Sequence, residues 1–309
     1  MTITATMVKE LREKSGAGMM DCKKALAETD GDFEAAVDWL RKKGLSAAAK
    51  KSSRIAAEGL VGLSFDGTKG ALIEVNAETD FVARNQLFQD FVLNLASLSV
   101  AVGGVDDLQG LAYPDTGRNV AEELTHNIAM IGENMSIRRL VALSVEAGAV
   151  SGYVHAAAEG SNGKLGRIGV LVALESQADA GALAQLGKQI AMHIAAANPR
   201  FLSVDEISEE DRERERNVLT EQARAEGRPE NIIQKMVEGR MRKFQEEVAL
   251  LEQIFVIDNE TKISDLLEKQ SKELGSKIIL KAFARFELGE GIEKKQDDFA
   301  AEVAAAVGG

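Results

Sequence analysis

The side chains that most often perform covalent or metal chemistry are scarce in this chain of 309 residues. Its three histidines, His126, His155 and His193, lie far apart and form no HxxxH or HxH pair, so we expect no zinc site built from neighbouring residues. The single cysteine, Cys22, excludes an internal disulfide and a CxxC metal knuckle and is typical of a reducing compartment. We expect Cys22 to be a small buried apolar side chain, and His193, which lies on an apolar run, to be structural.

Glycine-rich motifs that bind phosphate or present a nucleophile are also missing from the sequence. The nearest fragment is Gly160-Ser-Asn-Gly-Lys164, whose spacing differs from the GxxxxGK[ST] of a phosphate-binding loop, and neither GxGxxG nor GxSxG occurs. The sequence therefore predicts no familiar catalytic or nucleotide-binding motif. An enzyme that hydrolyses a nucleotide or an ester stays open as an alternative, but its polar cluster would have to be assembled in space from distant residues.

One short segment places a carboxylate beside a large aromatic ring. It is Glu78-Thr-Asp-Phe-Val-Ala-Arg-Asn85, which comes directly after a predicted strand. At a strand-to-helix junction, Asp80 and Phe81 could both point outward on a stiff base and act on a partner. In the alternative interpretation, Phe81 packs inward and Asp80 caps the helix that follows. The two interpretations differ in whether the ring of Phe81 is exposed.

The N-terminal part of the chain predicts a small helical unit. Residues 1–54 contain three short helical patterns, the third of which begins at Asp32, a good N-cap, and ends at Gly44, a good C′ residue. Because three helices of this length bury little apolar surface alone, we expect a docking module. Residues 41–54 carry six positive and no negative charges, which fits either a solvated linker or a surface for an anionic partner.

The middle of the chain predicts a repeated unit. Two hairpins, each followed by a helix, lie in the same order about 98 residues apart, and we interpret them as an internal duplication. A further helix over 120–131 and a strand over 136–144 are predicted between the two copies. The predicted elements are 60–65, 71–76 and 87–100 in the first copy and 148–155, 167–174 and 181–197 in the second.

A highly charged segment interrupts the second half of the chain. Residues 205–226 hold 13 charged residues in 22, nine acidic and four basic, which is too polar for a core. Gly227-Arg-Pro229 breaks this pattern and an apolar seam follows over 230–251, so we predict an antiparallel hairpin of two helices that projects into solvent. A strand over 277–288 and an amphipathic helix over 299–307, which a partner could receive, are predicted after it.

Composition narrows the class of protein. With 45% apolar and 28% charged residues the chain is an ordinary globular protein, and its formal charge of −12 argues against a protein that coats nucleic acid. A nucleic-acid or ribosome-binding module that acts through residues 41–54 stays open as a second alternative. No apolar run reaches the ~18 residues of a membrane span, and the N-terminus lacks the apolar run of a signal peptide. We therefore expect a soluble, cytoplasmic protein without a membrane partner.

Several blocks of the sequence resemble the bacterial elongation factor Ts family, and they occur in the family's order across almost the whole chain. The resemblance implies a guanine-nucleotide exchange factor for elongation factor Tu in translation elongation. Such a factor is a binding protein, not an enzyme, and needs no cofactor because the partner GTPase binds GDP, GTP and Mg²⁺. The blocks are Met7-Val-Lys-Glu-Leu-Arg12, Gly16-Ala-Gly-Met-Met-Asp-Cys-Lys-Lys-Ala-Leu26, Thr79-Asp-Phe-Val82, Ile131-Gly-Glu-Asn134, Ile190-Ala-Met-His-Ile-Ala-Ala196, Met236-Val-Glu-Gly-Arg240 and Phe286-Glu-Leu-Gly-Glu-Gly-Ile-Glu293.

The resemblance also implies an α+β fold of several parts. These are an N-terminal three-helix, ubiquitin-associated (UBA)-like domain, a core of two similar α+β subdomains, an inserted antiparallel coiled-coil hairpin and a C-terminal helical module. Self-association through the core subdomains is a further expectation. The corresponding ranges are 1–54 for the N-terminal domain and linker, 55–140 for the first subdomain, 141–204 with 252–290 for the second, 205–251 for the coiled coil and 291–309 for the C-terminal module.

Asp80 and Phe81 match the family's Asp-Phe pair, which enters the nucleotide domain of elongation factor Tu near its magnesium site. The resemblance implies that the ring of Phe81 wedges between helices of the partner and disturbs the Mg²⁺ and phosphate region. Val82, Ala83 and Arg84 continue this segment. Arg84 occupies a place that is often held by lysine in the family, so the charge is kept.

Three further residues are assigned to partner binding by the resemblance. Residues like Met19 and Met20 help the N-terminal domain of the family to grip elongation factor Tu, and thioether side chains suit an adaptable binding surface. His155 matches a Tyr-x-His of the second subdomain that reaches the GTPase. The turn after it, residues 156–165, is longer here than in the family.

Overall fold

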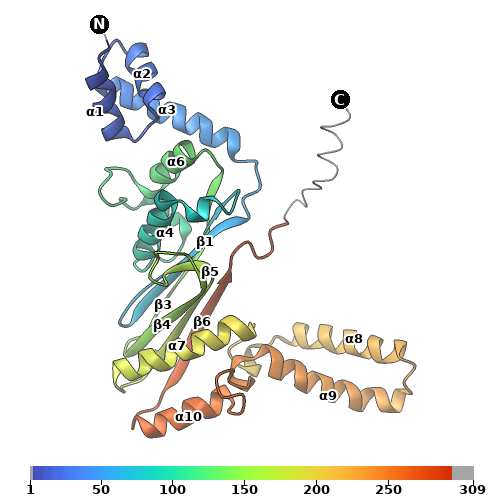
Figure 1. Ribbon diagram of the computed structural model, residues 1–309. Helices are drawn as coiled ribbons and strands as arrows, with labels where there is room; N and C mark the ends of the chain where they lie inside the picture. The colour runs from blue at the N-terminus through green and yellow to red at the C-terminus, as the bar shows by residue number, and fades with distance from the viewer. Residues whose placement is uncertain (1–2, 294–309) are drawn as a thin grey trace.

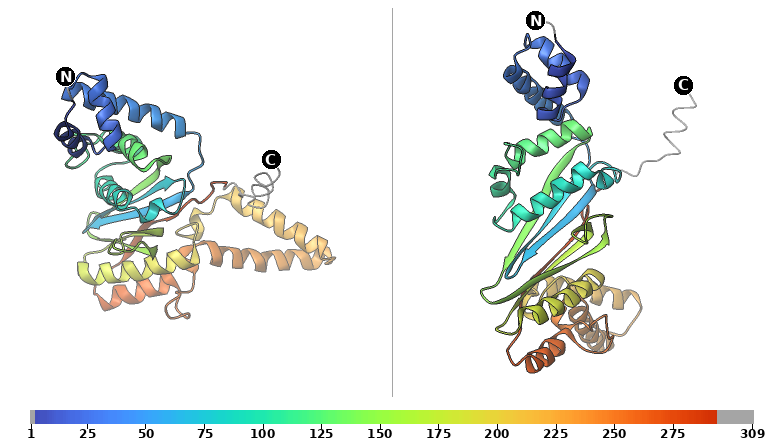
Figure 2. Two further views of the ribbon diagram at one scale, coloured as in Figure 1. Left: turned by 45° about the horizontal axis from the view of Figure 1, so that its top comes forward. Right: turned by 60° about the vertical axis from the view of Figure 1, so that its left-hand side comes forward.

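The structure, a computed structural model, describes residues 3–293, which form an elongated molecule (Figure 1). Three N-terminal helices lie at one end, a sheet with helices packed on it forms the rest of the body, and a pair of long helices projects to one side (Figures 1 and 2). The predicted α+β class is confirmed. The helix predicted over 299–307, and most of the expected C-terminal module, lie outside the described residues.

The N-terminal helices enclose a small apolar core. Leu11, Cys22 and Leu26 are buried in it, which confirms that Cys22 is a buried apolar side chain. The predicted N-cap is also present, because the carboxylate of Asp32 accepts a hydrogen bond from the backbone N–H of Ala35 at 3.0 Å. The helices are α1 (Ala5–Ser15), α2 (Met19–Glu28) and α3 (Phe33–Lys51).

Helix α3 continues through Gly44, so the predicted helix end at this glycine is wrong. Gly44 keeps a helical conformation and faces α6 (Val120–Ile131), where a methyl group in its place would lie 3.7 Å from the Cβ of Ala129. A methyl group there would make ordinary van der Waals contact, so the packing does not require glycine, and Gly44 does not form a left-handed helix end. Glycine occurs both inside helices and just after them, and the local sequence does not distinguish the two cases.

Most of the basic run over 41–54 is helix, its charged side chains are largely exposed, and three of its six charges pair within the chain. Two of these pairs join α3 to α2 and to α6, and the third joins the segment just after α3 to the segment after the second strand. Exposed pairs of this kind contribute at most about 1 kcal/mol each, so they orient the N-terminal helices more than they stabilise them. The pairs are Arg41 with Glu122, Lys43 with Asp21, and Arg54 with Glu78.

Within residues 3–293, six antiparallel strands form one sheet that consists of two three-stranded halves. In each half the first two strands form the predicted hairpin, and the third strand returns after intervening helices to pair with the second. The halves meet through a short ladder in which only Val61 and Gly62 pair with Gly166 and Leu165. The strands are β1 (Glu58–Asp66), β2 (Lys69–Ala77), β3 (Met135–Ser144), β4 (Gly148–Ala157), β5 (Leu165–Glu175) and β6 (Ile279–Glu287).

The two halves share an unusual glycine at the same place. Gly59 in β1 and Gly148 in β4 have φ angles of 124° and 129°, and a methyl group on them would lie 2.2 and 2.1 Å from the carbonyl oxygens of Val75 and Leu174. Only glycine fits such a close approach between strands. The β2–β3 and β5–β6 ladders also shift register next to these same two residues, Val75 and Leu174.

The two hairpins pack against each other through an apolar layer. Gly70 of β2 and Gly169 of β5 lie at this contact, and a side chain at either would collide with two apolar residues of the opposite half. The layer thus has matching contributions from both hairpins. Its members include Val61, Leu63 and Leu72 from the first half and Val150, Val154 and Leu171 from the second.

Helices cover the two halves of the sheet with two further cores. Phe88 and Leu95 of the predicted helix α4 are buried on the first half, and Leu183 and Ile190 of the predicted helix α7 are buried on the second. The prediction misses α5, which is only six residues long, and α10, although Ile263, Leu266 and Leu267 of α10 have helical spacing. The bounds are α4 (Gln86–Ser99), α5 (Val105–Gly110), α7 (Ala180–Ala197) and α10 (Ile263–Glu273).

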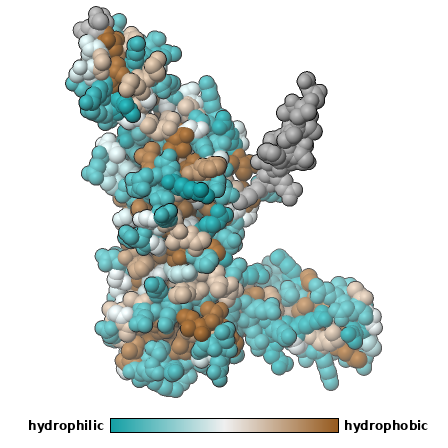
Figure 3. All heavy atoms as spheres, in the orientation of Figure 1, coloured by the Kyte–Doolittle hydropathy of each residue, from teal (hydrophilic) through white to brown (hydrophobic). Residues whose placement is uncertain are grey.

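The projecting pair consists of α8 (Glu209–Ala225) and α9 (Glu230–Val248), the two helices predicted for the charged segment. They bury a narrow seam of their own that includes Ala223, Val237 and Met241. Their surface is mostly hydrophilic on the face shown in Figure 3. This seam is separate from the three apolar layers of the sheet, so the pair has its own small core.

Candidate partner-binding site

The ring of Phe81 points into solvent at the junction between β2 and α4. It is 74% exposed, whereas the next residue, Val82, is 4% exposed and belongs to the core beneath α4. The interpretation in which Phe81 packs inward is therefore wrong, because Val82 fills that place. The ring of Phe81 therefore contributes little to the core and is accessible to a partner.

Asp80 does not cap α4, in contrast to the alternative interpretation. The cap is Asn85, whose side-chain oxygen accepts a hydrogen bond from the backbone N–H of Leu87 at 2.9 Å. Asp80 instead lies 3.7 Å from the guanidinium of Arg84, and both side chains are mainly exposed. An exposed pair of this kind contributes little stability, so both charges are accessible to a partner.

A short 3₁₀ helix, η1 (Val82–Arg84), gives the segment its rigidity. The backbone N–H of Arg84 donates to the carbonyl oxygen of Phe81 at 3.1 Å, and the amide of Gln89 donates to the carbonyl oxygen of Ala83 at 2.9 Å. Val82 and Ala83 pack on the core from this turn. Of the five residues predicted to act on a partner, these two support the segment from below, while Asp80, Phe81 and Arg84 face outward.

A second loop braces the segment on its other side, and the interpretation of the sequence missed it. The carboxylate of Glu133 accepts hydrogen bonds from the backbone N–H of Thr79 at 2.9 Å and from its hydroxyl at 2.7 Å. In return, the carboxylate of Glu78 accepts from the backbone N–H of Asn134. The only signal for this contact is that Thr79-Asp-Phe-Val82 and Ile131-Gly-Glu-Asn134 both belong to the blocks that carry the family resemblance.

Met19 and Met20 lie in the first turn of α2 and are 57% and 75% exposed. The apolar core of the N-terminal helices is formed on the other side of α2 by Cys22, Ala25 and Leu26. The two thioethers therefore do not fill a core. They form an exposed apolar pair on the end of the molecule that lies beyond the sheet (Figure 1).

His155 lies on β4, which pairs only with β5 among the described strands. Its ring is exposed, and its Nδ1 lies 3.3 Å from the hydroxyl of Tyr153 on the same side of the strand. The predicted residues thus fall on three separate places, α2, the start of α4 and β4, which follow one another along the molecule (Figure 1). A partner that touched all three would have to be large.

The other two histidines have structural surroundings. His193 is fully buried, its Nε2 lies 2.9 Å from Oε1 of Gln253, and its Nδ1 accepts from the backbone N–H of Val256 at 3.2 Å, which confirms the structural interpretation. His126 faces Gly16 of the N-terminal unit. Burial lowers the pKa of both rings. Within residues 3–293, no three His, Cys, Asp or Glu side chains are placed to hold a metal ion.

Comparison with known proteins decides the family. The sequence model of a family described as Elongation factor TS matches residues 78–290. The chain belongs to the elongation factor Ts family. Proteins named Elongation factor Ts from Rhodospirillum rubrum, Paramagnetospirillum magneticum and Magnetococcus marinus are 62%, 61% and 56% identical to it. These alignments cover 98%, 99% and 100% of this chain and 98%, 97% and 100% of the relatives.

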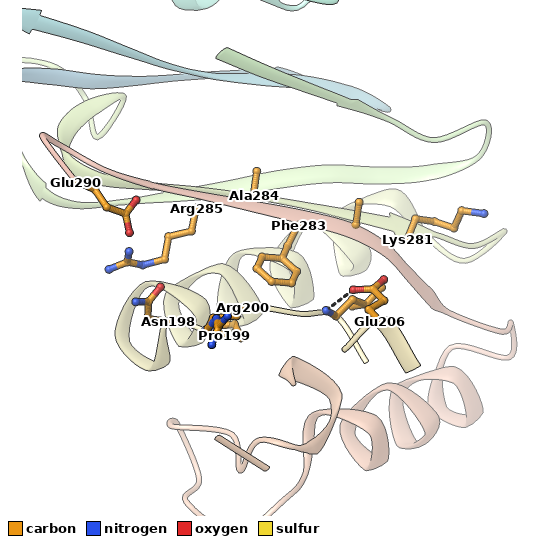
Figure 4. Close-up of a pocket in the computed structure, with 11 residues that line it drawn as sticks. Asn198, Pro199, Arg200, Glu206, Lys281, Phe283, Ala284, Arg285 and Glu290 are labelled. Atoms are coloured by element: carbon orange, nitrogen blue, oxygen red, sulfur yellow. Dashed lines mark hydrogen bonds between the residues drawn. The ribbon is translucent and has the colours of Figure 1, made fainter. Parts of the chain in front are cut away.

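The elongation factor Ts chain also has a hollow of about 530 Å³ between β6 and the segment after α7 (Figure 4). Most of the charged side chains that line it are paired, and its lining includes no Ser, Thr, Cys or His. The pairs are Lys281 with Glu175, Arg285 with Glu287, and Glu290 with Arg139.

No helix among the described residues is long and apolar enough to cross a lipid bilayer.

Proposed function

We propose that this protein is the guanine-nucleotide exchange factor of elongation factor Tu and acts in the cytoplasm during translation elongation. The observation that carries the proposal is the exposed ring of Phe81, with Asp80 beside it, on a segment braced by η1 and by Glu133. The membership of the chain in the elongation factor Ts family supplies the partner. The factor has no catalytic chemistry or cofactor of its own, because GDP, GTP and Mg²⁺ belong to the partner GTPase.

Exchange of this kind is a coupling between two binding events. A factor that binds the nucleotide-free GTPase more tightly than the GDP form must weaken GDP binding by the same ratio. In the proposed mechanism, Phe81 inserts between helices of the partner, and Asp80 and Arg84 act beside it on the Mg²⁺ and phosphate region. No proton transfer or nucleophile is required.

Burial of the Phe81 ring alone cannot account for the lowering of the barrier to GDP release. Release that is faster by ~10³–10⁴-fold requires a barrier lower by ~4–5.5 kcal/mol, at about 1.36 kcal/mol per decade. Complete burial of one phenylalanine ring contributes only ~1.5–3 kcal/mol. The difference must come from other contacts made in the exchange step, which we assign to Asp80, Arg84 and His155. Met19 and Met20 instead hold the factor on the partner.

We further propose that the parts of the chain have different roles. A UBA-like domain over 1–54 docks on the partner, and subdomains over 55–140 and over 141–204 with 252–290 form the core. The matched glycines and register shifts of the two halves support an origin of these subdomains by duplication. We also propose that residues 205–251 form a coiled coil and that a C-terminal module over 291–309 adds a contact with the partner. The core subdomains are proposed to mediate self-association.

The proposal is tested by the release of a fluorescent GDP from elongation factor Tu. We expect micromolar concentrations of the protein to accelerate release, and we expect no GTP hydrolysis by the protein alone. Unchanged release from a GTPase of proven activity would refute the exchange function. Turnover of GTP or of an ester by the isolated protein would favour the enzyme alternative, and salt-sensitive binding to RNA would favour the nucleic-acid alternative.

A further inference from the structure

Residues 78–79 and 133–134 lie on two loops that are distant in sequence, and each loop has a carboxylate that accepts hydrogen bonds from the other. Glu133, just beyond the end of α6, binds both the backbone N–H and the hydroxyl of Thr79, and Glu78 binds the backbone N–H of Asn134. The side-chain amide of Asn134 also donates to the carbonyl oxygen of Arg54 at 2.7 Å. The contact between Thr79 and Glu133 therefore belongs to a reciprocal arrangement that links β2, α6 and the end of the N-terminal unit.

This arrangement lies immediately before the exposed ring. Phe81 is 74% exposed and gains little orientation from packing of its own side chain. Its direction is set by the backbone on either side of it, through Val82 in the core after it and through Thr79 before it. A residue that must act in one orientation gains activity when its support is rigid, since less conformational freedom is lost on binding.

We propose that Glu133 is a positioning residue for nucleotide exchange, which holds Thr79 so that Asp80 and Phe81 are presented in the active orientation. This inference rests on the proposed exchange function. Glu133 need not touch the nucleotide or the metal of the partner to act in this way. Its contribution is the pair of hydrogen bonds to Thr79, and it should follow hydrogen bonding more closely than charge.

The chemistry of the two side chains allows these contributions to be separated. A hydroxyl can both donate and accept, so a glutamine at position 133 could accept from the Thr79 backbone N–H and donate to the Thr79 hydroxyl. Glu133→Gln therefore removes the charge and keeps both contacts, whereas Glu133→Ala removes both. Thr79→Val removes only the hydroxyl contact, and Thr79→Ser keeps it.

The first measurement is the rate of GDP release from elongation factor Tu as a function of factor concentration. We expect Glu133→Ala to lower the maximal rate about tenfold, or about 1.4 kcal/mol in the barrier, and to leave the half-saturating concentration within about threefold. Glu133→Gln should restore the rate to within about twofold, and Thr79→Val should fall between the two. Glu146→Ala, which alters an exposed glutamate between β3 and β4, is the matched control and should behave like the unaltered protein.

A second measurement separates positioning from general stability. Combined with Asp80→Ala and Phe81→Ala, the Glu133→Ala change should cause little further loss of rate, because both side chains that it positions are already absent. Losses that multiply, or a Glu133→Ala loss that glutamine does not restore, would overturn the proposal. So would a maximal rate that Glu133→Ala leaves unchanged.

Hydrogen exchange of the free protein tests the brace without any partner. We expect Glu133→Ala to reduce the protection of the Thr79 amide and of residues 80–84, while the amides of β4 and β5 stay protected. Unchanged protection at Thr79 would refute the brace itself. If the unaltered protein fails to accelerate GDP release, the exchange function fails and the positioning role fails with it, whereas loss of protection would still establish the brace.

Discussion

The buried carboxylate of Glu74 on β2 accepts a hydrogen bond from the backbone N–H of Gly289 at 2.8 Å, although 215 positions separate the two residues. Arg138 and Arg139 of β3 bind the same carboxylate at 2.9 and 2.5 Å and also donate to backbone oxygens near Gly289. Burial alone would raise the pKa of Glu74, but Gly289, Asn76 and the two arginines together hold it below its ordinary value. The chain that leaves β6 is thus fastened to the first half of the sheet.

Glu74→Ala should destabilise the protein by about 3 kcal/mol or more, because it leaves two partly buried arginines and a buried backbone N–H without their acceptor. Urea unfolding measures the change. The matched control is Glu175→Ala on β5, which removes a partly exposed pair with Lys281 and should cost less than about 1 kcal/mol. Equal losses in the two variants would contradict a special role for the Glu74 carboxylate.

Phe81→Ala should leave stability almost unchanged and slow exchange strongly. Since the ring is exposed, we expect the free energy of unfolding to change by less than about 1 kcal/mol. Loss of ~1.5–3 kcal/mol of burial in the partner would lower the maximal GDP-release rate about ten- to a hundredfold. Asp80→Ala should resemble it. A destabilised Phe81→Ala with an unchanged rate per folded molecule would remove Phe81 from the mechanism.

The methionine pair should behave differently from Phe81. Met19→Ala combined with Met20→Ala removes two exposed thioethers from α2, where they contact no core, so association with elongation factor Tu should weaken. A saturating concentration of the variant should then recover most of the maximal rate. The dependence of the rate on factor concentration measures both quantities. A lowered maximal rate with unchanged half-saturation would place the pair in the exchange step itself.

The projecting helices should be removable without loss of the core. The chain enters and leaves the pair side by side, because the backbone N–H of Leu250 donates to the carbonyl oxygen of Phe201 at 2.9 Å. Replacing residues 208–247 by a short Gly/Ser linker keeps these contacts and keeps Leu250, which is buried in the core beneath α7. We expect cooperative melting and much of the exchange activity. Unfolding of this variant would show that α8 and α9 belong to the core.

The hairpins and the longer amphipathic helices could be predicted from the sequence because their signals are local. Apolar runs on either side of Asp66-Gly67 identify β1 and β2, and Gly67, the first residue of the two-residue loop, has the positive φ that a type II′ turn requires. Gly44 shows the limit of this approach. It lies inside α3, and the residues next to it do not distinguish it from a glycine that ends a helix.

The candidate site could likewise be predicted only in part from the sequence. A carboxylate next to a ring after a strand identified Asp80 and Phe81, but the sequence alone left open whether the ring faced inward. Val82 settles this in the structure because it takes the buried place. The bracing by Glu133 could not be predicted, since it depends on hydrogen bonds between groups that are 54 positions apart.

Acidification below pH 7 should destabilise the protein through His193. Burial lowers the pKa of this ring, and its Nδ1 already accepts from the Val256 N–H, so the folded state favours the neutral form. As pH falls through about 6.5, this histidine binds a proton in the unfolded chain but not in the folded chain. The free energy of unfolding should therefore decrease below that pH and keep its maximal contribution from His193 above it. Burial also lowers the pKa of His126, so this residue should add to the effect.

Urea unfolding between pH 7.5 and 5 measures the slope of the unfolding free energy against pH. His193→Leu should be less stable at pH 7.5 yet lose less stability on acidification than the unaltered protein. An unchanged slope in His193→Leu would show that the proton is taken up elsewhere.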